Sequence, residues 1–232
     1  MNRYQKLISN TALFGISTFA SKFLTFLLTP FYTRVLSSAE YGVADLLVQT
    51  GNLLIPLASI GIANGVIRFG LERSSNKNGV FTTGIVTTLV GFLLLLAFSP
   101  LLGRLEFLSG NLWLVLLYVL MANLHSVCNQ FARAVGHVRL FAVDGVLCTG
   151  LVILLNILFL SVFSMGATGY MLANVLSDGL SALFVFLKAR QWQYISLPSL
   201  SKGEVSGMLR YSAPLVPSNL CTWIINISDR YL

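Results

Sequence analysis

The chain has 232 residues, of which 56% are hydrophobic and only 10% are charged, and its mean hydropathy is +0.80. Soluble domains carry about 25% charged residues, so this composition excludes an ordinary soluble protein. The net charge of +7 comes from basic residues spread thinly through short connections. This distribution argues against nucleic-acid binding and favours membrane topology as its cause.

Seven hydrophobic runs follow one another along the chain, and each is long enough to cross a bilayer as a helix, which takes about 20 residues. We therefore expect an all-α fold, a polytopic transmembrane helical bundle. The predicted spans are 8–32, 41–65, 81–102, 112–131, 143–163, 167–187 and 211–232.

The domain organisation follows from one long connection late in the chain. Residues 1–187 are interpreted as a six-helix N-terminal lobe, 188–207 as a cytoplasmic linker, and 208–232 as the first transmembrane helix of a second lobe. Because that last span would stand alone, we expect the chain to be a fragment of a longer protein.

Basic residues set the expected orientation in the membrane. If the N-terminus is cytoplasmic, eleven lysines and arginines lie in the inner segments and three in the outer ones. Cytoplasmic loops carry an excess of these residues, so we predict a cytoplasmic N-terminus and short outer connections.

The first span carries a lysine, Lys22, near its middle. Residues spaced alternately three and four apart share one helix face, and the face of Lys22 also bears Thr11, Gly15, Thr18, Thr25 and Thr29. A lysine at the centre of a membrane helix costs about 2.5–3.5 kcal/mol on insertion scales, and such residues usually mark a pathway. Two interpretations stay open: a structural role with an interhelical partner, or a water-filled cavity in which Lys22 meets an anion.

The second and seventh spans repeat this polar stripe, with Asp45, Gln49 and Asn52 in one and Asn219 and Asp229 in the other. Folding the first two spans as a hairpin sets Lys22 level with Asn52 and about 10 Å from Asp45 along the axis. A simple ion pair between neighbours is therefore not expected. The third span, by contrast, is almost purely apolar after Thr88, and we expect it to face lipid.

Other polar residues receive plainer interpretations. Arg68, Arg133 and Asp144 lie at the predicted inner ends of spans, where they are interpreted as anchors. Asp178 fits either the cavity or interhelical bonding. The two histidines, the three cysteines and the acidic residues show no metal-ligand spacing and no catalytic pairing, so no metal site and no catalytic residue is predicted.

Four segments, in this order and spacing, resemble the Wzx-type polysaccharide flippases of the multidrug/oligosaccharidyl-lipid/polysaccharide exporter superfamily. They are FGISTFASKFLTFLLTPFYTRVLSSAEYG, GIANGVIRF, QFARAVGHVR and YSAPLVPSNLCTWIINISDRYL. The resemblance implies two six-helix lobes around a central cavity bounded largely by helices one, two, seven and eight. The chain would then supply one lobe and helix seven of a twelve- to fourteen-helix transporter.

What the resemblance implies about function is movement of an undecaprenyl-diphosphate-linked oligosaccharide across the bacterial inner membrane by alternating access. Such a step serves O-antigen, capsule or exopolysaccharide biosynthesis. We expect Lys22 to hold the diphosphate, and Gln49, Asn52 and Asn219 to hydrogen-bond sugar hydroxyls.

The expected coupling ion is H⁺ or Na⁺, with Asp45 or Asp229 as its site, and no other cofactor is expected. The expected partners are the lipid-linked substrate, membrane lipids and a polysaccharide polymerase complex, with no nucleic acid.

Three rival functions are weighed against this reading. A drug/cation antiporter of the same superfamily would share the architecture, but a lysine in its cavity would repel a cationic substrate. A membrane-embedded polysaccharide-assembly enzyme would need a sizeable extramembrane loop, and the outer connections are short. A non-transporting assembly protein would bury the charged stripes away from water.

Overall fold

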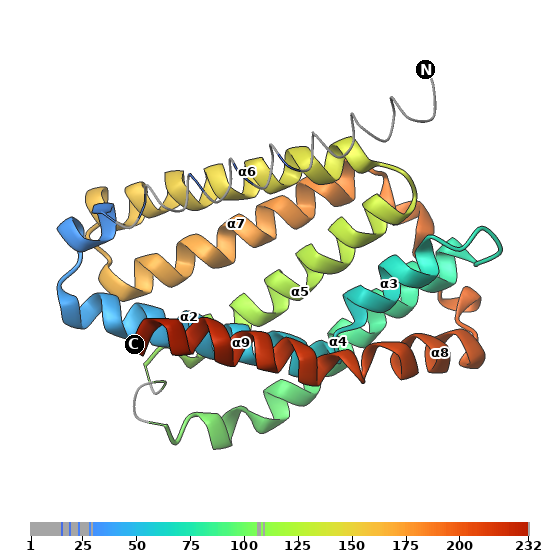
Figure 1. Cartoon of the computed structure of the whole chain (residues 1–232), viewed down its shortest axis with the longest axis horizontal. Coiled ribbons are helices and arrows are strands. Elements are labelled where there is room, and N and C mark those ends of the chain that lie inside the picture. The colour runs from blue at the N-terminus through green and yellow to red at the C-terminus, as the bar shows by residue number, and fades with distance from the viewer. Residues whose placement is uncertain are drawn as a thin grey trace.

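The computed structural model describes residues 15, 19, 23, 28, 30–105, 108 and 110–231, and of residues 226 and 229–231 it describes the backbone alone. Every regular element in these residues is helical (Figure 1), which confirms the predicted all-α fold. Residues 30–35 are helical. The α-helices that follow are α2 (Ser38–Ser59), α3 (Ile62–Gly70), α4 (Lys77–Leu102), α5 (Leu112–Ala134), α6 (Val138–Asn156), α7 (Gly166–Lys188), α8 (Lys202–Ser212) and α9 (Leu215–Tyr231).

Several of the described helices are built to cross a bilayer. Helices α4, α5, α7, and α6 together with the π-helical turn Ile157–Val162 that continues it, are long and apolar enough to span, and the bent pair α2–α3 would make a fifth crossing. Only 6% of the apolar window of α4 is buried inside the bundle, against 44% for α5. Helix α5 is therefore central, whereas the apolar part of α4 lies on the surface of the described bundle, and its exposure to lipid stays a prediction.

The second predicted span is broken rather than continuous. Ile60 and Gly61 both adopt left-handed backbone conformations, with φ of 52° and 61°, and they separate α2 from α3 by a bend of 55°. Pro56 contributes, because it supplies no backbone N–H while its carbonyl accepts from the N–H of Gly61 at 3.2 Å. The expectation of one helix over 41–65 was wrong at this point, and α3 runs on to Gly70.

Helix α2 begins where its sequence supplies a capping box. The Ser37 hydroxyl accepts from the backbone N–H of Glu40 at 3.3 Å, and the Glu40 carboxylate accepts from the backbone N–H of Ser37 at 2.9 Å. This reciprocal pair satisfies donors that the first helical turn leaves open.

Two of the three apolar clusters in the described residues hold most of the helices together. One joins α3, α4, α5, α7 and α8 and includes Phe81, Phe131 and Met208. The other joins α2, α5 and α7 and includes Leu47 and Met171. In a bilayer the gain from such clusters comes from close packing rather than from exclusion of water. Helices α5 and α7 both contribute to the two clusters, and together they form the centre of the bundle.

The segment between α7 and α8 is packed against the bundle. The Gln191 side chain is fully buried and donates to the Cys128 carbonyl of α5 at 2.7 Å. Thr82 of α4 donates to the Tyr194 carbonyl at 3.2 Å and accepts from the Ser196 N–H at 3.0 Å. The connection that the sequence marks as a linker is thus fixed in place.

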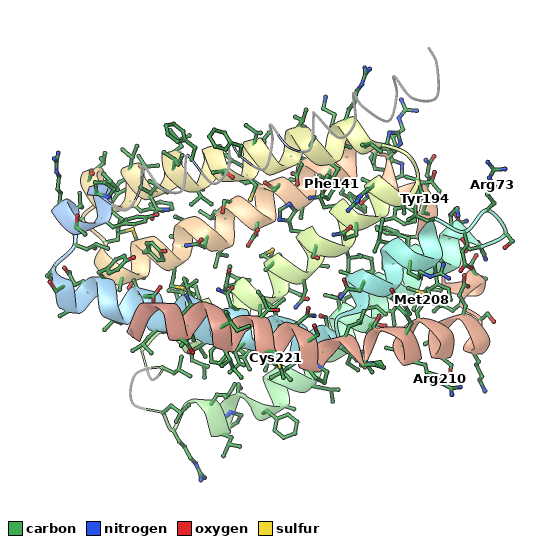
Figure 2. All side chains as sticks on the ribbon, viewed as in Figure 1. Arg73, Phe141, Tyr194, Met208, Arg210 and Cys221 are labelled. Carbon is green, nitrogen blue, oxygen red and sulfur yellow. The ribbon has the colours of Figure 1, made fainter. Side chains whose placement is uncertain are left out.

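Helices α8 and α9 follow this segment, and α9 packs along α2 (Figure 1). Arg73 and Arg210 lie at one end of the bundle with Tyr194 and Met208 (Figure 2), and we call this the basic end. The expected seventh span, 211–232, is divided: residues 211–212 are the end of α8, and α9 begins at Leu215, after Pro214, which has no N–H to continue α8.

Glu204 of α8 provides a test of how α8 docks on α4. Its carboxylate lies so close to Gly79 that a Cβ at that position would overlap it, and burial raises the pKa of Glu204 above its ordinary value. A raised carboxyl pKa means that folding disfavours the ionised form, so this contribution lowers stability as pH rises above about 4.3. We expect Glu204→Gln to remove that part of the pH dependence and to raise the thermal midpoint at pH 7 by no more than about 2 °C. Thermal unfolding of both proteins in detergent from pH 4 to 8 checks this, and an unchanged difference between them across that range would contradict it.

Candidate functional site

The predicted stripe on α2 is a connected row of polar side chains. The Gln49 amide donates to the Asp45 carboxylate at 3.5 Å, and the Asn52 amide donates to the Gln49 side-chain oxygen at 3.5 Å. Both distances are at the long limit for hydrogen bonds. A shorter bond anchors the row, because the Tyr118 hydroxyl of α5 donates to the Asn52 side-chain oxygen at 2.9 Å.

Helix α9 contacts the backbone of α2 at the same stripe. The Trp223 indole donates to the Gln49 backbone carbonyl at 2.9 Å. One turn earlier on α9, about 6 Å along the axis, exposed Asn219 lies beside the bend in α2–α3, since a Cβ on Gly61 would stand 3.7 Å from the Asn219 amide nitrogen. The structure thus brings Gln49 and Asn52 together and sets Asn219 against the end of the same helix.

Other predicted site residues lie outside this description. Lys22 is among the residues that the structure does not describe. Asp229 belongs to α9, but its side chain is not described. Their predicted roles therefore stay predictions.

Polar side chains of α5 and α7 donate to backbone carbonyls, either of their own helix or of α2. Asn123 donates to the Ile55 carbonyl of α2 at 3.2 Å, which ties α5 to α2. On α7, the Asn174 amide donates to the Tyr170 carbonyl at 2.8 Å and the Ser177 hydroxyl to the Asn174 carbonyl at 3.0 Å. These bonds satisfy polar groups inside the bundle.

A cluster that sequence reasoning missed lies among α5, α6 and α7. His125 of α5 places its Nδ1 atom 2.9 Å from an Asp178 oxygen of α7 and its Nε2 atom 2.7 Å from an Asp144 oxygen of α6. Asp144 is fully buried. We call these three residues the histidine–aspartate cluster.

The interpretation of Asp144 as a membrane-end anchor was wrong, because Asp144 is fully buried. Helix α6 begins at Val138, five residues before the predicted start at 143, so Asp144 lies almost two turns inside the helix. An ionisable residue on each of three spans is a signal of function, but pairing them required the fold.

The cluster is not arranged as a metal site in this structure. His125, Cys148 and Asp178 each place one donor atom within 4.8 Å of the others. Ligands of one tetrahedral zinc ion would lie about 3.3 Å apart, whereas the His125 and Asp178 atoms stand at the 2.9 Å of a hydrogen bond. We therefore treat the contact as a hydrogen bond and not as metal ligation.

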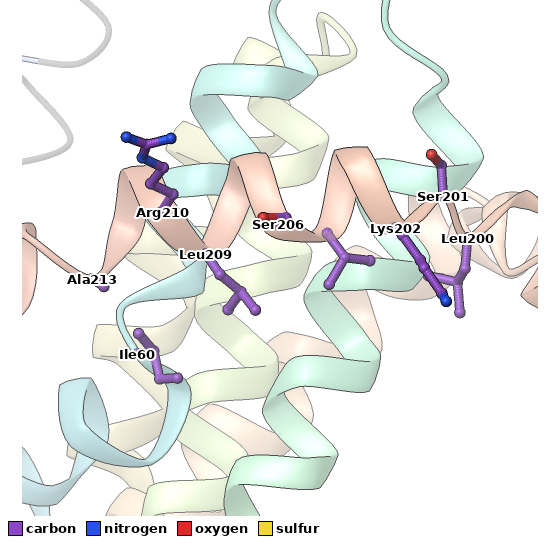
Figure 3. Close-up of a pocket in the computed structure, with 9 residues that line it drawn as sticks. Ile60, Leu200, Ser201, Lys202, Ser206, Leu209, Arg210 and Ala213 are labelled. Atoms are coloured by element: carbon purple, nitrogen blue, oxygen red, sulfur yellow. The ribbon is translucent and has the colours of Figure 1, made fainter.

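An apolar groove between the end of α2, α4 and α8 does not belong to the polar stripe. A cavity of about 710 Å³ lies under α8 (Figure 3), where Leu209 points toward Ile60 and Arg210 points away. A second cavity of about 510 Å³ shares Ile60 and Leu209 and continues along the surface of α4. Its lining offers little to bind a sugar.

Tyr118 is the residue on which the α2 row depends. Tyr118→Phe keeps the ring that packs against Gly51 but leaves the Asn52 oxygen without its short donor. We expect a loss of about 1–2 kcal/mol in the free energy of unfolding. Thermal unfolding checks this against Tyr211→Phe, whose side chain is exposed and whose change should stay within about 0.5 kcal/mol. Equal stability of the two variants would contradict the anchoring role.

Solved structures of membrane transporters share this arrangement of helices. An outward-facing multidrug resistance MATE family transporter of the MOP superfamily has a TM-score of 0.71 at 18% identity, over 91% of this chain and 52% of its own. A MATE transporter in complex with MaL6 gives 0.66 at 20%, over 91% and 52%. A MOP superfamily transporter from Pyrococcus furiosus, described by the reverse polarity of its binding pocket, gives 0.63 at 18%, over 91% and 52%. The chain thus spans about half the length of these transporters.

Residues 31–232 match the family described as polysaccharide biosynthesis protein, and the chain belongs to that family. No curated protein matches it. The family match agrees with the resemblance seen in the sequence, and the long apolar helices together with the shared fold identify a multi-pass membrane protein.

Proposed function

We propose that this chain forms half of a flippase that carries an undecaprenyl-diphosphate-linked oligosaccharide across the bacterial inner membrane. The observation that carries the proposal is the amide row of α2, held by Tyr118 and approached by α9, in a chain of the polysaccharide biosynthesis family. Diphosphate and sugar hydroxyls do not cross hydrocarbon unaided, because burying them without partners is costly. Amide groups inside a membrane supply such partners.

The residues divide the work by chemistry. In our proposal Lys22 attracts the diphosphate by charge, while Gln49, Asn52 and Asn219 exchange hydrogen bonds with sugar hydroxyls. The isoprenoid tail stays in lipid, and rocking of two lobes about the site exposes it to each side in turn. Within the polar stripes of α2 and α9, Asp45 and Asp229 are the candidates to bind a coupling H⁺ or Na⁺.

Orientation in the membrane is part of the same proposal. Arg73 and Arg210 share the basic end (Figure 2), and the excess of basic residues in the corresponding connections favours its placement in the cytoplasm. The N-terminus would then also be cytoplasmic.

A drug/cation antiporter is the second candidate, favoured by the structural similarity to MATE transporters. That similarity is below 25% identity and concerns the fold alone. The two functions differ in the charge that the cavity must receive, so Lys22 distinguishes them.

The test is Lys22→Ala in a cell whose surface polysaccharide depends on this protein. We expect surface polysaccharide to fall at least tenfold with the lipid-linked precursor accumulating, because the diphosphate loses its cation. Lys22→Arg, which keeps the charge, should retain most of the export. Normal export by the alanine variant would refute the role of Lys22, and drug efflux that the variant improves would support the antiporter.

A further inference from the structure

The histidine–aspartate cluster lies well inside the bundle. His125 is nine residues from the end of α5 and Asp178 ten from the end of α7, which places both about 14–15 Å from the basic end along their helices. The amide row of α2 is a separate set of contacts. The cluster therefore calls for an explanation of its own.

The two contacts of His125 require an extra proton. A neutral imidazole carries one N–H and one bare nitrogen, and an ionised carboxylate has no hydrogen to donate. Both ring nitrogens lie within hydrogen-bond distance of carboxylate oxygens, at 2.9 and 2.7 Å. Both contacts are hydrogen bonds at once only when the cluster holds one proton more than a neutral histidine with two carboxylates.

Charge and burial support the same conclusion. Within the part of the chain that the structure describes, His125 is the only basic residue that pairs with Asp144 or Asp178. The second oxygen of fully buried Asp144 has no hydrogen-bond partner there. A buried carboxylate without compensation is costly, so the cluster attracts a positive charge.

We propose that the histidine–aspartate cluster is a proton-binding site of this lobe, with the proton on the His125 ring. When the proton is bound, the imidazolium ties α5 to both α6 and α7. When it leaves, one ring nitrogen faces a carboxylate with no hydrogen between them, and one of the two ties is lost. The site rests on the proposed function for its purpose, which is to couple proton movement to the packing of helices during transport.

The groups that face the cluster from its own and neighbouring helices are two thiols, a phenol and one further carboxylate. Cys148 of α6 lies 3.8 Å from Asp178, and Tyr118 and Cys128 of α5 interact electrostatically with Asp178 and Asp144. Thiols and phenols ordinarily titrate above about pH 8. On α2, which packs against α5 and α7, Asp45 bonds to Gln49.

The chain offers a clean measurement because it contains two histidines. The measurement is NMR of ¹⁵N-histidine-labelled protein in lipid nanodiscs. In the His137→Gln variant the only histidine signal comes from His125, and in the His125→Gln variant it comes from exposed His137, which serves as the reference. At pH 7.5 we expect both ring nitrogens of His125 to carry hydrogen. Asp144→Asn, of nearly the same size, should abolish the doubly protonated signal.

Two outcomes would overturn the proton site. One is a neutral His125 ring at pH 7.5 in otherwise unsubstituted protein, a result that requires no cluster variant to fold. The other is a His125 signal that responds to added Na⁺ or Zn²⁺ at constant pH and not to pH itself, which would make the site one for a metal cation.

The coupling role is tested separately in cells. We expect Asp144→Asn and Asp178→Asn to reduce surface polysaccharide at least tenfold at wild-type protein levels, with His137→Gln as the unaffected control. Normal export by both aspartate variants would overturn the coupling. A chain whose deletion leaves polysaccharide unchanged would refute the proposed function, while the protonation measured by NMR would stand.

Discussion

Gly91→Leu is expected to lower the thermal unfolding midpoint of the chain by about 5–10 °C. The cause is overpacking, which should reduce the free energy of unfolding by about 1–3 kcal/mol. Gly91 lies on α4 where the helix passes the Ala58 carbonyl of α2, and a Cβ at Gly91 would overlap that oxygen. Replacing a helical glycine ordinarily gains about 0.5–1 kcal/mol, so the overlap must outweigh the gain in helix propensity. The end of α2 has little freedom to move aside, because Ile60 and Gly61 fix the bend that follows.

Gly150→Leu is the matched control for this substitution. Gly150 is a helical glycine of α6, and nothing lies within 4 Å of a Cβ built there. Its replacement should leave the midpoint unchanged or slightly higher. Unfolding of the two variants in the same detergent makes the comparison, and equal midpoints would show that α2 and α4 are not in close contact at Gly91.

The length and hydrophobicity of the spans made most of the helices predictable. The spans predicted at 112–131 and 167–187 agree with α5 and α7 within three residues at each end. The position of α4 on the surface of the described bundle was also predictable, because an uninterrupted apolar run leaves no polar face for the interior. Composition and periodicity are local properties, and these features depend on nothing else.

Features that depend on backbone conformation were harder to predict. Pro56 and Gly61 stand near the break between α2 and α3, yet a left-handed isoleucine at position 60 is uncommon and has no signature in the sequence. Prediction from hydropathy alone therefore gave one continuous span across this break. The same limitation placed the start of α6 five residues late, which turned the buried Asp144 into an apparent surface anchor.

Only part of the candidate site could be predicted from local sequence patterns. The row of Asp45, Gln49 and Asn52 follows from helical spacing within one span, and the structure shows it. Tyr118 lies within an apolar run, and nothing local marks it as the partner of Asn52. Contacts between spans are set by helix packing, which a single sequence does not display.

His125→Ala is expected to cost about 3–5 kcal/mol of the free energy of unfolding, because it leaves two carboxylates inside the bundle without their partner. Asp144 is fully buried and the Asp178 side chain is only 18% exposed, so water compensates little of the loss. Exposed His137 provides the control, and His137→Ala should change stability by less than about 0.5 kcal/mol.

The decisive comparison replaces the whole cluster with apolar residues. Combining His125→Leu with Asp144→Leu and Asp178→Leu removes the buried charges together with their partner, and such replacements are often neutral or stabilising. We therefore expect the triple variant to unfold at a higher temperature than His125→Ala and to have lost its proton-binding site. If His125→Ala instead proves as stable as the unsubstituted chain, the two carboxylates are not held against the ring, and the helices α5, α6 and α7 are tied by their apolar contacts alone.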